Sequence, residues 1–423
     1  MVIRHGRGIP PPPHQDAGSH RRVPPRGPGG SRTRRAESPC GSSRGGCGIR
    51  YGVGFGTGRR LAACLLALLL AAGCARRAPS GTSTRAGTAA AALQQRYYRS
   101  GRWLTAGYWQ NAQAFSIVLD EYQRTGSAQW RADITEVYRA NSRGAIGDFN
   151  APYVDDEGWW ALDWIRAWDL TGNPAYLSTA KAIFRDMSAT WDTACGGGVW
   201  WNHTKTYKNA IPNELFLLVA DELHEVTPGD AGAGSYLWWA QREAAWFEGS
   251  GLINARGQVN DGLTFSCFNN GGTPWTYNQG VILAGMAELA HITGDKAYLH
   301  LAERIADAEV RYGTTPGGVL YEAGCEPNNG CGSDGPLFKG IFIRYLWWLY
   351  AYAPQPAYRA LITASQDSLW NHDRTPGNLF GLHWAGPAPQ PGQINVEDDI
   401  AGTMAFTSVS VAAVPRPRRG PAA

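Results

Sequence analysis

The chain has 423 residues, 43% of them apolar, with 18 Trp and 18 Tyr, a composition that indicates a folded protein rich in aromatic side chains. Its formal charge of +4 hides an uneven distribution, because the Arg-rich first 77 residues carry about +12 and the remainder about −8. An acidic body gives no electrostatic basis for binding nucleic acid, so no nucleic-acid partner is expected.

The first 94 residues are predicted to lie outside the folded body. Residues 1–58 form a low-complexity leader of Gly, Pro, Arg and Ser, with almost no large aliphatic side chains to bury in a core. Residues 59–74 combine two Arg, a short apolar run and small residues before Cys74, which is typical of a secretory signal peptide. The run is too short to remain as a membrane-spanning helix. We therefore expect an exported protein, with a linker over residues 75–94.

The end of this signal carries a candidate lipidation site. The stretch Ala71-Ala72-Gly73-Cys74 resembles a bacterial lipobox, although Ala71 stands where Leu is usual. It predicts a lipid on Cys74 that anchors the protein to the outer face of the cell membrane. Because an export signal so far into a chain is unusual, we also expect translation to begin near Val53.

Four of the eight cysteines lie in the exported body, where disulfides persist. Cys325 and Cys331 flank a Pro-Asn-Asn-Gly turn and are predicted to form a disulfide. A bond between Cys195 and Cys267 is left open, because their spacing does not favour it. No spacing of cysteines matches a zinc site, and His203 is given no role. No cofactor and no catalytic metal is expected, while a structural calcium is left open.

From residue 95 to residue 412 the sequence repeats a helical hairpin. The segment from Asp169 to Ile183 matches the segment from His291 to Ile305 almost residue for residue, with a Thr-Gly turn before an amphipathic helix. Gly-rich stretches with short β-like runs follow these helices. Each stretch leads into a helix that is apolar except for its first turn.

These polar first turns recur at intervals of 46 to 65 residues, centred on Gln110, Asp156, Asn213, Asn278, Phe338 and Asp398. Helices that are apolar all round are buried, so six inner helices and six amphipathic outer helices predict an all-α (α/α)6 toroid over residues 95–412. The polar tips and Gly-rich loops would meet at one rim and form a binding cleft. Residues 413–423 are expected to be a disordered tail.

Two adjacent carboxylates, Asp155 and Asp156, lie at the start of the second inner helix. Paired carboxylates are the machinery of glycoside hydrolysis, and neighbouring residues suit the short separation of a retaining enzyme. Asp156 is expected to have the higher pKa of the two, since like charges this close do not ionise independently. The alternative is that acidic residues in a first turn only complement the helix dipole.

Other carboxylates could also reach the cleft. Asp398 and Asp399 repeat the doublet, and Glu214 is a further candidate. An inverting enzyme would pair distant carboxylates instead, for example Asp156 with Asp334.

Side chains suited to sugar recognition are expected around the pair. Aromatic faces stack on pyranose rings, while amide, carboxylate and amine groups hydrogen-bond to sugar hydroxyls. The predicted substrate-binding residues are Trp109, Trp159, Trp201, Asn209, Asn213, Tyr277, Asn278, Gln279, Asp334 and Lys339.

Several of these motifs resemble glycoside hydrolase family 76. They are Tyr153-Val-Asp-Asp-Glu-Gly-Trp-Trp, Gly196-Gly-Gly-Val-Trp-Trp-Asn, Tyr207-Lys-Asn-Ala-Ile-Pro-Asn-Glu-Leu and Thr276-Tyr-Asn-Gln-Gly. The resemblance implies an (α/α)6 fold and a retaining endo-α-1,6-mannanase. It also implies that Asp155 is the nucleophile and Asp156 the general acid/base.

The expected partner is therefore an α-mannan or a manno-oligosaccharide, bound by a monomer. Two other functions remain open. A cell-wall mannan transglycosylase would share the first half-reaction and replace water with a sugar acceptor. A glycan-binding surface lipoprotein would keep the cleft without turnover, although Asp155 and Asp156 argue against that alternative.

Overall fold

The structure is a computed structural model that describes residues 80–142, 149–390 and 392–411. The chain divides into two units, Met1–Ala71 and Ala72–Ala423, and all the described residues belong to the second. The predicted leader, translation start, signal peptide, lipidation site at Cys74 and C-terminal tail lie outside the described residues.

An inner set of six helices begins at the six polar turns that the sequence predicts. Their bodies are buried on nearly every side, as expected for helices at the centre of a toroid. They are α2 (Tyr108–Thr125), α4 (Val154–Thr171), α6 (Ala210–Glu225), α8 (Thr276–Thr293), α10 (Phe338–Tyr352) and α12 (Val396–Ser410).

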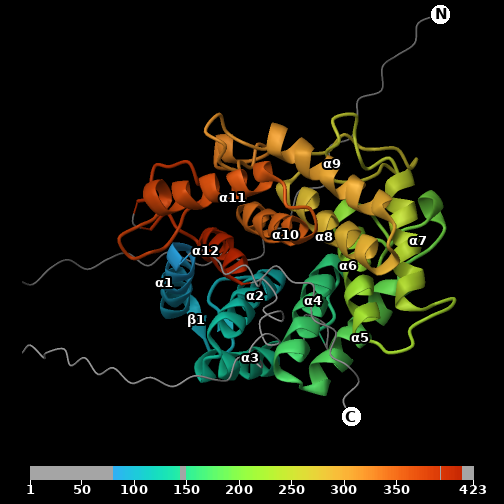
Figure 1. The fold of residues 1–423 in the computed structure, drawn as a ribbon, viewed down its shortest axis with the longest axis horizontal. Helices are drawn as coiled ribbons and strands as arrows, with labels where there is room; N and C mark the ends of the chain where they lie inside the picture. Colours follow the sequence, from blue (N-terminus) through green and yellow to red (C-terminus); the bar gives the residue numbers. More distant parts are fainter. Residues whose placement is uncertain (1–79, 143–148, 391, 412–423) are drawn as a thin grey trace, which may run out of the picture. The chain divides into compact units, whose positions relative to one another are not determined.

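An outer set of six helices surrounds them, so that inner and outer helices alternate along the chain (Figure 1). The outer helices are α1 (Ser80–Tyr97), α3 (Ala128–Asn141), α5 (Pro174–Ala189), α7 (Tyr236–Gly249), α9 (Lys296–Tyr312) and α11 (Pro356–Ser368). This all-α (α/α)6 arrangement is the predicted one.

Helix α1 corrects the predicted domain boundary. The linker expected over residues 75–94 is instead helical from Ser80 onward, and the helix packs against α12. Its stripe of Ala86, Ala89, Ala90 and Leu93 is fully buried in the core. The stripe has helical spacing but consists mostly of Ala, so its hydrophobic contrast with the rest of the segment is too small to distinguish a helix from a linker.

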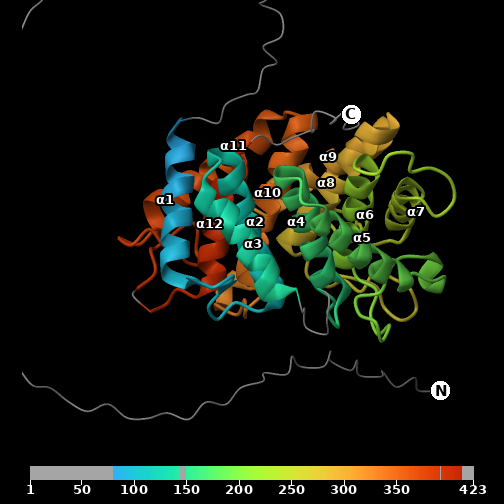
Figure 2. The same cartoon turned by 90° about the horizontal axis from the view of Figure 1, so that it is seen from below.

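Because α12 also packs against α2, the two ends of the described chain meet and close the ring. Figure 2 shows α1, α12 and α2 lying side by side along one common direction. The close approach of inner helices depends on small residues. At Gly340 of α10, an added Cβ would lie 2.7 Å from the backbone oxygen of Ala401 in α12.

The Thr-Gly turns of the repeat end inner helices and start outer ones. Helices α2, α4 and α8 end at Gly126, Gly172 and Gly294, each in the left-handed conformation that glycine adopts without strain. The next residue, Ser127, Asn173 or Asp295, then caps the following outer helix through its side-chain oxygen.

The rim loops contain little regular structure. A two-stranded sheet pairs β1 (Tyr98–Arg99) with β2 (Arg102–Trp103), and the other loops form isolated bridges such as Tyr153 with Asn202. Short helical turns are η1 (Ala194–Gly196), η2 (Glu326–Asn328), η3 (Gly335–Leu337) and η4 (Leu369–Asp373).

Two disulfides cross-link these rim loops. Cys325 is bonded to Cys331, the pair that flanks the short turn, and Cys195 is bonded to Cys267. The second bond joins the loop after α5 to the loop after α7, so only the folded chain brings its cysteines together.

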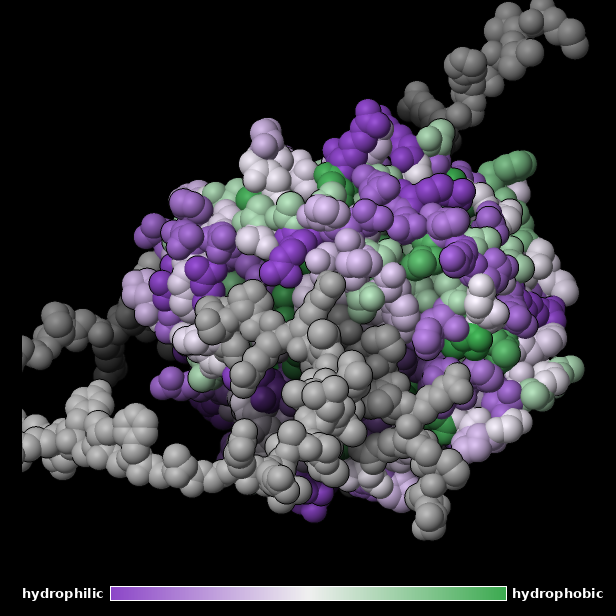
Figure 3. Space-filling model, viewed as in Figure 1, coloured by the Kyte–Doolittle hydropathy of each residue, from purple (hydrophilic) through white to green (hydrophobic). Residues whose placement is uncertain are grey.

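The face of the molecule drawn in Figure 3 is largely hydrophilic. On the face in Figure 3, outside the grey atoms, hydrophobic residues form small scattered groups among hydrophilic ones. Within the described ranges, no helix is both long enough and apolar enough to cross a membrane.

Candidate active site

The start of α4 presents Asp155 and Asp156 at the rim. The chain enters α4 in an extended conformation at Tyr153, which forms a bridge with Asn202, and the N–H of Val154 donates to the carbonyl of Trp201. The N-cap residue Tyr153 makes no side-chain cap. The first-turn N–H groups and the positive end of the helix dipole are therefore available to the two carboxylates.

Asp155 is surrounded by donors. Its Oδ2 accepts a hydrogen bond of 3.2 Å from Nε1 of Trp201, and backbone N–H groups of Asp155 and Asp156 also favour its charged form. Burial nevertheless raises the pKa of Asp155 to about 7. Its Oδ1 is buried and has no hydrogen-bond partner among the described residues, which leaves one oxygen for a ligand.

Asp156 is surrounded by negative charge. Burial is the largest cause that raises its pKa well above the usual value, and the charges of Asp155, Asp334 and Glu157 raise it further. Of the two carboxyls, Asp156 is the one whose surroundings favour the protonated form more strongly, because the neighbouring charges add to the effect of burial. One ionised and one protonated carboxyl side by side can act as nucleophile and acid.

A third carboxylate, Asp334, belongs to the same site. It lies just before η3, and its Oδ1 accepts hydrogen bonds from Nε1 of Trp109 at 3.1 Å and from Nε2 of Gln110 at 2.8 Å. Trp109 stacks on Trp159, with ring centroids 6.1 Å apart. Trp159 is only 4% exposed, so it supports Trp109 from behind and offers little surface to a ligand.

Aromatic rings from α8, from α10 and from the loop before α6 form another part of the site. Tyr277 stacks on Phe338 with centroids 3.8 Å apart. Its pKa is raised by burial and then by the charges of Asp261, Asp155 and others, which places its hydroxyl among the site carboxylates. Asp261 accepts a 2.6 Å hydrogen bond from the hydroxyl of Tyr207, and the amide of Asn278 favours its charged form.

The sequence analysis missed Asp261 and Gln110 as site residues. Asp261 lies in a loop without regular structure, and no spacing in the sequence marks it. Gln110 is recognisable only as part of a polar helix tip, and its contact with Asp334 joins the first inner helix to the loop before the fifth.

In five inner helices the fourth residue holds a rim loop in place, and we call this residue a loop anchor. Its side-chain oxygen accepts a hydrogen bond from a backbone N–H of the rim loop that precedes the helix. The pairs are Asn111 with Trp103, Glu157 with Ala151, Asn213 with Val199, Gln279 with Val259 and Asp399 with Phe380. Unpaired backbone groups are costly when buried, which explains why a polar residue occupies this position in an otherwise apolar helix.

Two residues predicted to bind substrate are therefore structural. The amide of Asn213 is fully buried and also donates to the carbonyls of Val199 and Asn209. The amide of Gln279 is equally buried and donates to the carbonyls of Val259 and Trp275. Both side chains use their hydrogen-bonding groups on the loops, a role that the sequence analysis did not foresee.

Lys339, also predicted to bind substrate, likewise uses its polar group within the protein. Its ammonium group is fully buried, lies 2.5 Å from Oε1 of Glu326, and donates to the carbonyl of Leu382 at 2.7 Å. Asn209 is 4% exposed, with its Oδ1 buried and without a hydrogen-bond partner in the described part of the chain. Glu214, one of the rival carboxylates, is completely buried.

The comparisons with known proteins agree with this geometry. Mannan endo-1,6-alpha-mannosidase DCW1 of Candida albicans is 35% identical over 219 residues, which is 48% of this chain and 48% of the relative. The protein of the same name from Saccharomyces cerevisiae is 30% identical over 254 residues, or 54% of each chain. The matched region thus spans about half the length of these curated relatives.

Solved structures match over nearly their whole length. A protein of Listeria innocua superposes with a TM-score of 0.68 at 27% identity, covering 78% of this chain and 96% of that one. An α-1,6-mannanase of Salegentibacter has a TM-score of 0.69 at 22% identity, covering 78% and 99%. That structure is an inactive variant, with two consecutive aspartates replaced by asparagine, in complex with α-1,6-mannotriose.

The sequence model described as glycosyl hydrolase family 76 matches residues 82–420, which include α1 and extend through α12. This match supports a domain that begins well before residue 95. The chain belongs to glycosyl hydrolase family 76.

Proposed function

We propose that this protein is an exported, retaining endo-glycosidase that hydrolyses α-1,6-mannosidic linkages in mannan-type polysaccharides. The observation that carries the proposal is the unequal environment of two adjacent carboxylates. Asp155 receives hydrogen bonds from Trp201 and from backbone N–H groups, whereas Asp156 faces Asp155, Asp334 and Glu157.

In the proposed mechanism, Asp155 attacks the anomeric carbon while Asp156 donates its proton to the leaving glycosidic oxygen. The bond to the leaving sugar breaks as the bond to Asp155 forms. Asp156, now ionised, then removes a proton from water. The water oxygen displaces Asp155 from the anomeric carbon, and the proton taken from this water leaves Asp156 protonated again.

The substrate class follows from the relatives. The curated relatives are named for endo-1,6-α-mannosidase activity on mannan, and the Salegentibacter mannanase was captured with α-1,6-mannotriose. The two consecutive aspartates of that enzyme correspond in kind to Asp155 and Asp156. Trp109 and Tyr277 are partly exposed at the site and are suited to stack on sugar rings.

Export and anchoring are part of the proposal. Two disulfides in the body suit an oxidising compartment. The signal-like residues 59–74 and the lipid on Cys74 would place the enzyme on the outer face of the membrane, as a monomer, within reach of polymeric mannan.

Product analysis of the purified protein on linear α-1,6-mannan tests the proposal. We expect manno-oligosaccharides that retain the anomeric configuration, and their loss in Asp155→Asn and Asp156→Asn. Products longer than the substrate, formed when a mannobiose acceptor is added, would identify a transglycosylase instead. Binding of mannan without cleavage would identify a glycan-binding protein.

A further inference from the structure

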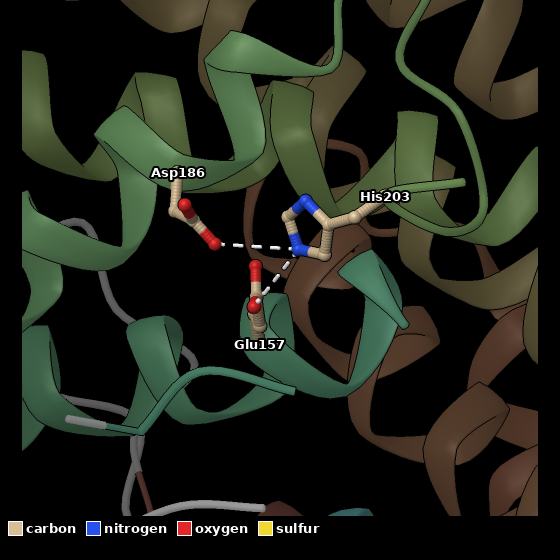
Figure 4. A group of neighbouring side chains, drawn as sticks. All are labelled: Glu157, Asp186 and His203. Carbon is tan, nitrogen blue, oxygen red and sulfur yellow. Dashed lines mark hydrogen bonds and ion pairs between the residues drawn. The ribbon is translucent and has the colours of Figure 1, made fainter. Parts of the chain in front are cut away.

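Three side chains from separate elements meet behind the catalytic pair. Glu157 lies in the first turn of α4, Asp186 lies in α5, and His203 lies in the loop before α6, and Figure 4 shows all three directed toward one another. Nε2 of His203 is 3.2 Å from Oε1 of Glu157 and 3.3 Å from Oδ2 of Asp186. One ligand atom from each residue lies within 4.8 Å of the others.

The carboxylate of Glu157 has an unused oxygen. Its Oε1 accepts the N–H of Ala151 as a loop anchor, but its Oε2 is buried without a hydrogen-bond partner among the described residues, and the residue is completely buried. In α2, α6 and α8 the anchor at the same position is an amide, whose NH2 group donates to loop carbonyls. A carboxylate cannot donate in this way, so its second oxygen is left as an unpaired acceptor. Asp399, the carboxylate anchor of α12, has the same unpaired oxygen, but only at Glu157 do a histidine and a second carboxylate lie close by among the described residues.

We propose that Glu157, Asp186 and His203 form a binding site for a divalent cation of the zinc class. One imidazole and two carboxylates are a ligand set that suits zinc, with room for water as the fourth ligand. Bonds of about 2.0–2.2 Å at tetrahedral angles separate neighbouring ligand atoms by about 3.4 Å. The separations from Nε2 of His203 to the two carboxylates, 3.2 and 3.3 Å, are close to this value, and the ligand atoms of Glu157 and Asp186 lie within 4.8 Å of each other.

The site is open to solvent, and a backbone N–H orients one of its side chains. The side chains of His203 and Asp186 are 31% and 35% exposed, so a hydrated ion reaches them from solvent. The N–H of Ala151 holds the carboxylate of Glu157 in place at 2.8 Å, as outer partners do in metal sites.

The bound cation would cross-link α4, α5 and the loop that contains His203. Trp201, which donates to Asp155, lies two residues before His203 on that loop. The metal would therefore hold the nucleophile's partner in position. Because metal binding does not require turnover, the test below does not depend on the proposed function.

Zinc titration of the metal-stripped full-length protein tests the site. We expect one Zn²⁺ per chain by mass spectrometry of bound metal, and a rise in Tm on the order of 5 °C at saturating Zn²⁺. Asp186→Asn and His203→Ala should each weaken Zn²⁺ binding at least tenfold. Mg²⁺ and Ca²⁺, which prefer all-oxygen ligands, should give a smaller rise in Tm than Zn²⁺.

Glu157→Gln is the matched variant. Glutamine keeps the acceptor for Ala151 and reproduces the amide anchor of the other helices, so the metal-free protein should fold with a Tm near that of the parent. It should lose the Zn²⁺-dependent rise. His300→Ala, on an exposed position of α9, should keep the rise.

The proposal is overturned if the parent takes up no Zn²⁺. It is equally overturned if the Asp186 and His203 variants bind Zn²⁺ as tightly as the parent, or if Ca²⁺ stabilises the protein more than Zn²⁺ does. Asp186 is partly exposed and belongs to no loop anchor, so its variant keeps the test decisive even if His203→Ala does not fold.

Discussion

Helices α4 and α12 begin with matching first turns, Val154 to Glu157 in one and Val396 to Asp399 in the other. In both, the second and third residues are acidic and the fourth is a carboxylate that anchors the preceding loop. The residues before them differ. Asn395 precedes α12 and Tyr153 precedes α4.

The identity of the N-cap residue determines whether the third residue of the helix, Asp156 or Asp398, takes part in capping. Asn395 forms a capping box with Asp398, in which the Asn side chain accepts from the N–H of Asp398 at 2.7 Å and the carboxylate of Asp398 faces the N–H of Asn395 at 3.4 Å. Tyr153 cannot form such a box, so Asp156 is not drawn into helix capping. An acidic doublet at an inner-helix tip is therefore a candidate for catalysis only where the N-cap residue leaves it free.

The largest expected effect is on activity, which should fall when the first turn of α4 is changed but not when the first turn of α12 is changed. Asp155→Asn and Asp156→Asn should each lower kcat/KM on α-1,6-mannan about 10³-fold or more, because they remove the nucleophile or the acid. Asp398→Asn, the matched change in α12, should leave kcat/KM within a few-fold of the parent. Steady-state kinetics with reducing-sugar detection measures both, and equal losses in the two helices would refute the comparison.

The next largest expected effect concerns the indole N–H of Trp201, which donates to Asp155 at the start of α4. Trp201→Phe removes the N–H that favours the charged form of Asp155 while keeping an aromatic ring. We expect roughly a tenfold or greater loss of kcat/KM at neutral pH, since hydrogen bonds to charged groups contribute about 1.5–3 kcal/mol.

The pH profile sharpens this prediction. The pKa of Asp155 is about 7, so kcat/KM of the parent should fall as pH decreases through about 7 and the nucleophile gains a proton. In Trp201→Phe this limb should move to higher pH. An unmoved limb with a reduced maximum would mean that Trp201 contacts the substrate and does not act through Asp155.

Substitutions at the start of α12 should change the stability of the protein more than they change its activity. Asp399→Ala removes the acceptor for the buried N–H of Phe380 and should cost about 1–3 kcal/mol of unfolding free energy. Urea denaturation measures this loss. Asp399→Asn, which keeps an acceptor, is the control and should recover most of the loss.

The smallest expected effect is the pH dependence of stability at α4. Burial raises the pKa of Asp155 from 3.8 to about 7, so the folded protein binds more protons than the unfolded chain between these values. The stability associated with this proton is complete below about pH 4 and is lost as pH rises through about 7. Asp155→Asn removes the penalty, so its Tm relative to the parent should increase by a few degrees between pH 4 and pH 8. Calorimetric Tm values that differ by a constant amount across this range would contradict the assignment.

Much of the fold could be read from the sequence. The Thr-Gly turns, the caps that follow them and the apolar helix bodies are local signals, and they located the six inner helices and five outer ones. Helix α1 was missed because alanine fills its buried stripe. The disulfide from Cys195 to Cys267 could not be assigned because its cysteines belong to two different rim loops.

The candidate site was predicted less completely. Asp155 and Asp156 were recognisable because they lie in a motif that resembles family 76 and among side chains suited to sugars. A list of polar tip residues, however, could not separate ligands from anchors. Asn213, Gln279 and Lys339 have the same chemistry as residues that bind sugars. Asn213 and Gln279, however, form hydrogen bonds with the loop backbone, and Lys339 forms a buried ion pair.

The sequence by itself determined the helical hairpin repeat, the acidic body and the position of the acidic pair at a helix start, because these depend on local spacing along the chain. Which polar tips hold loops, and that Glu157, Asp186 and His203 meet, became visible only in the folded chain. Those properties depend on burial and on neighbours from distant segments. A pKa or a ligand set is therefore established only when the ring has closed.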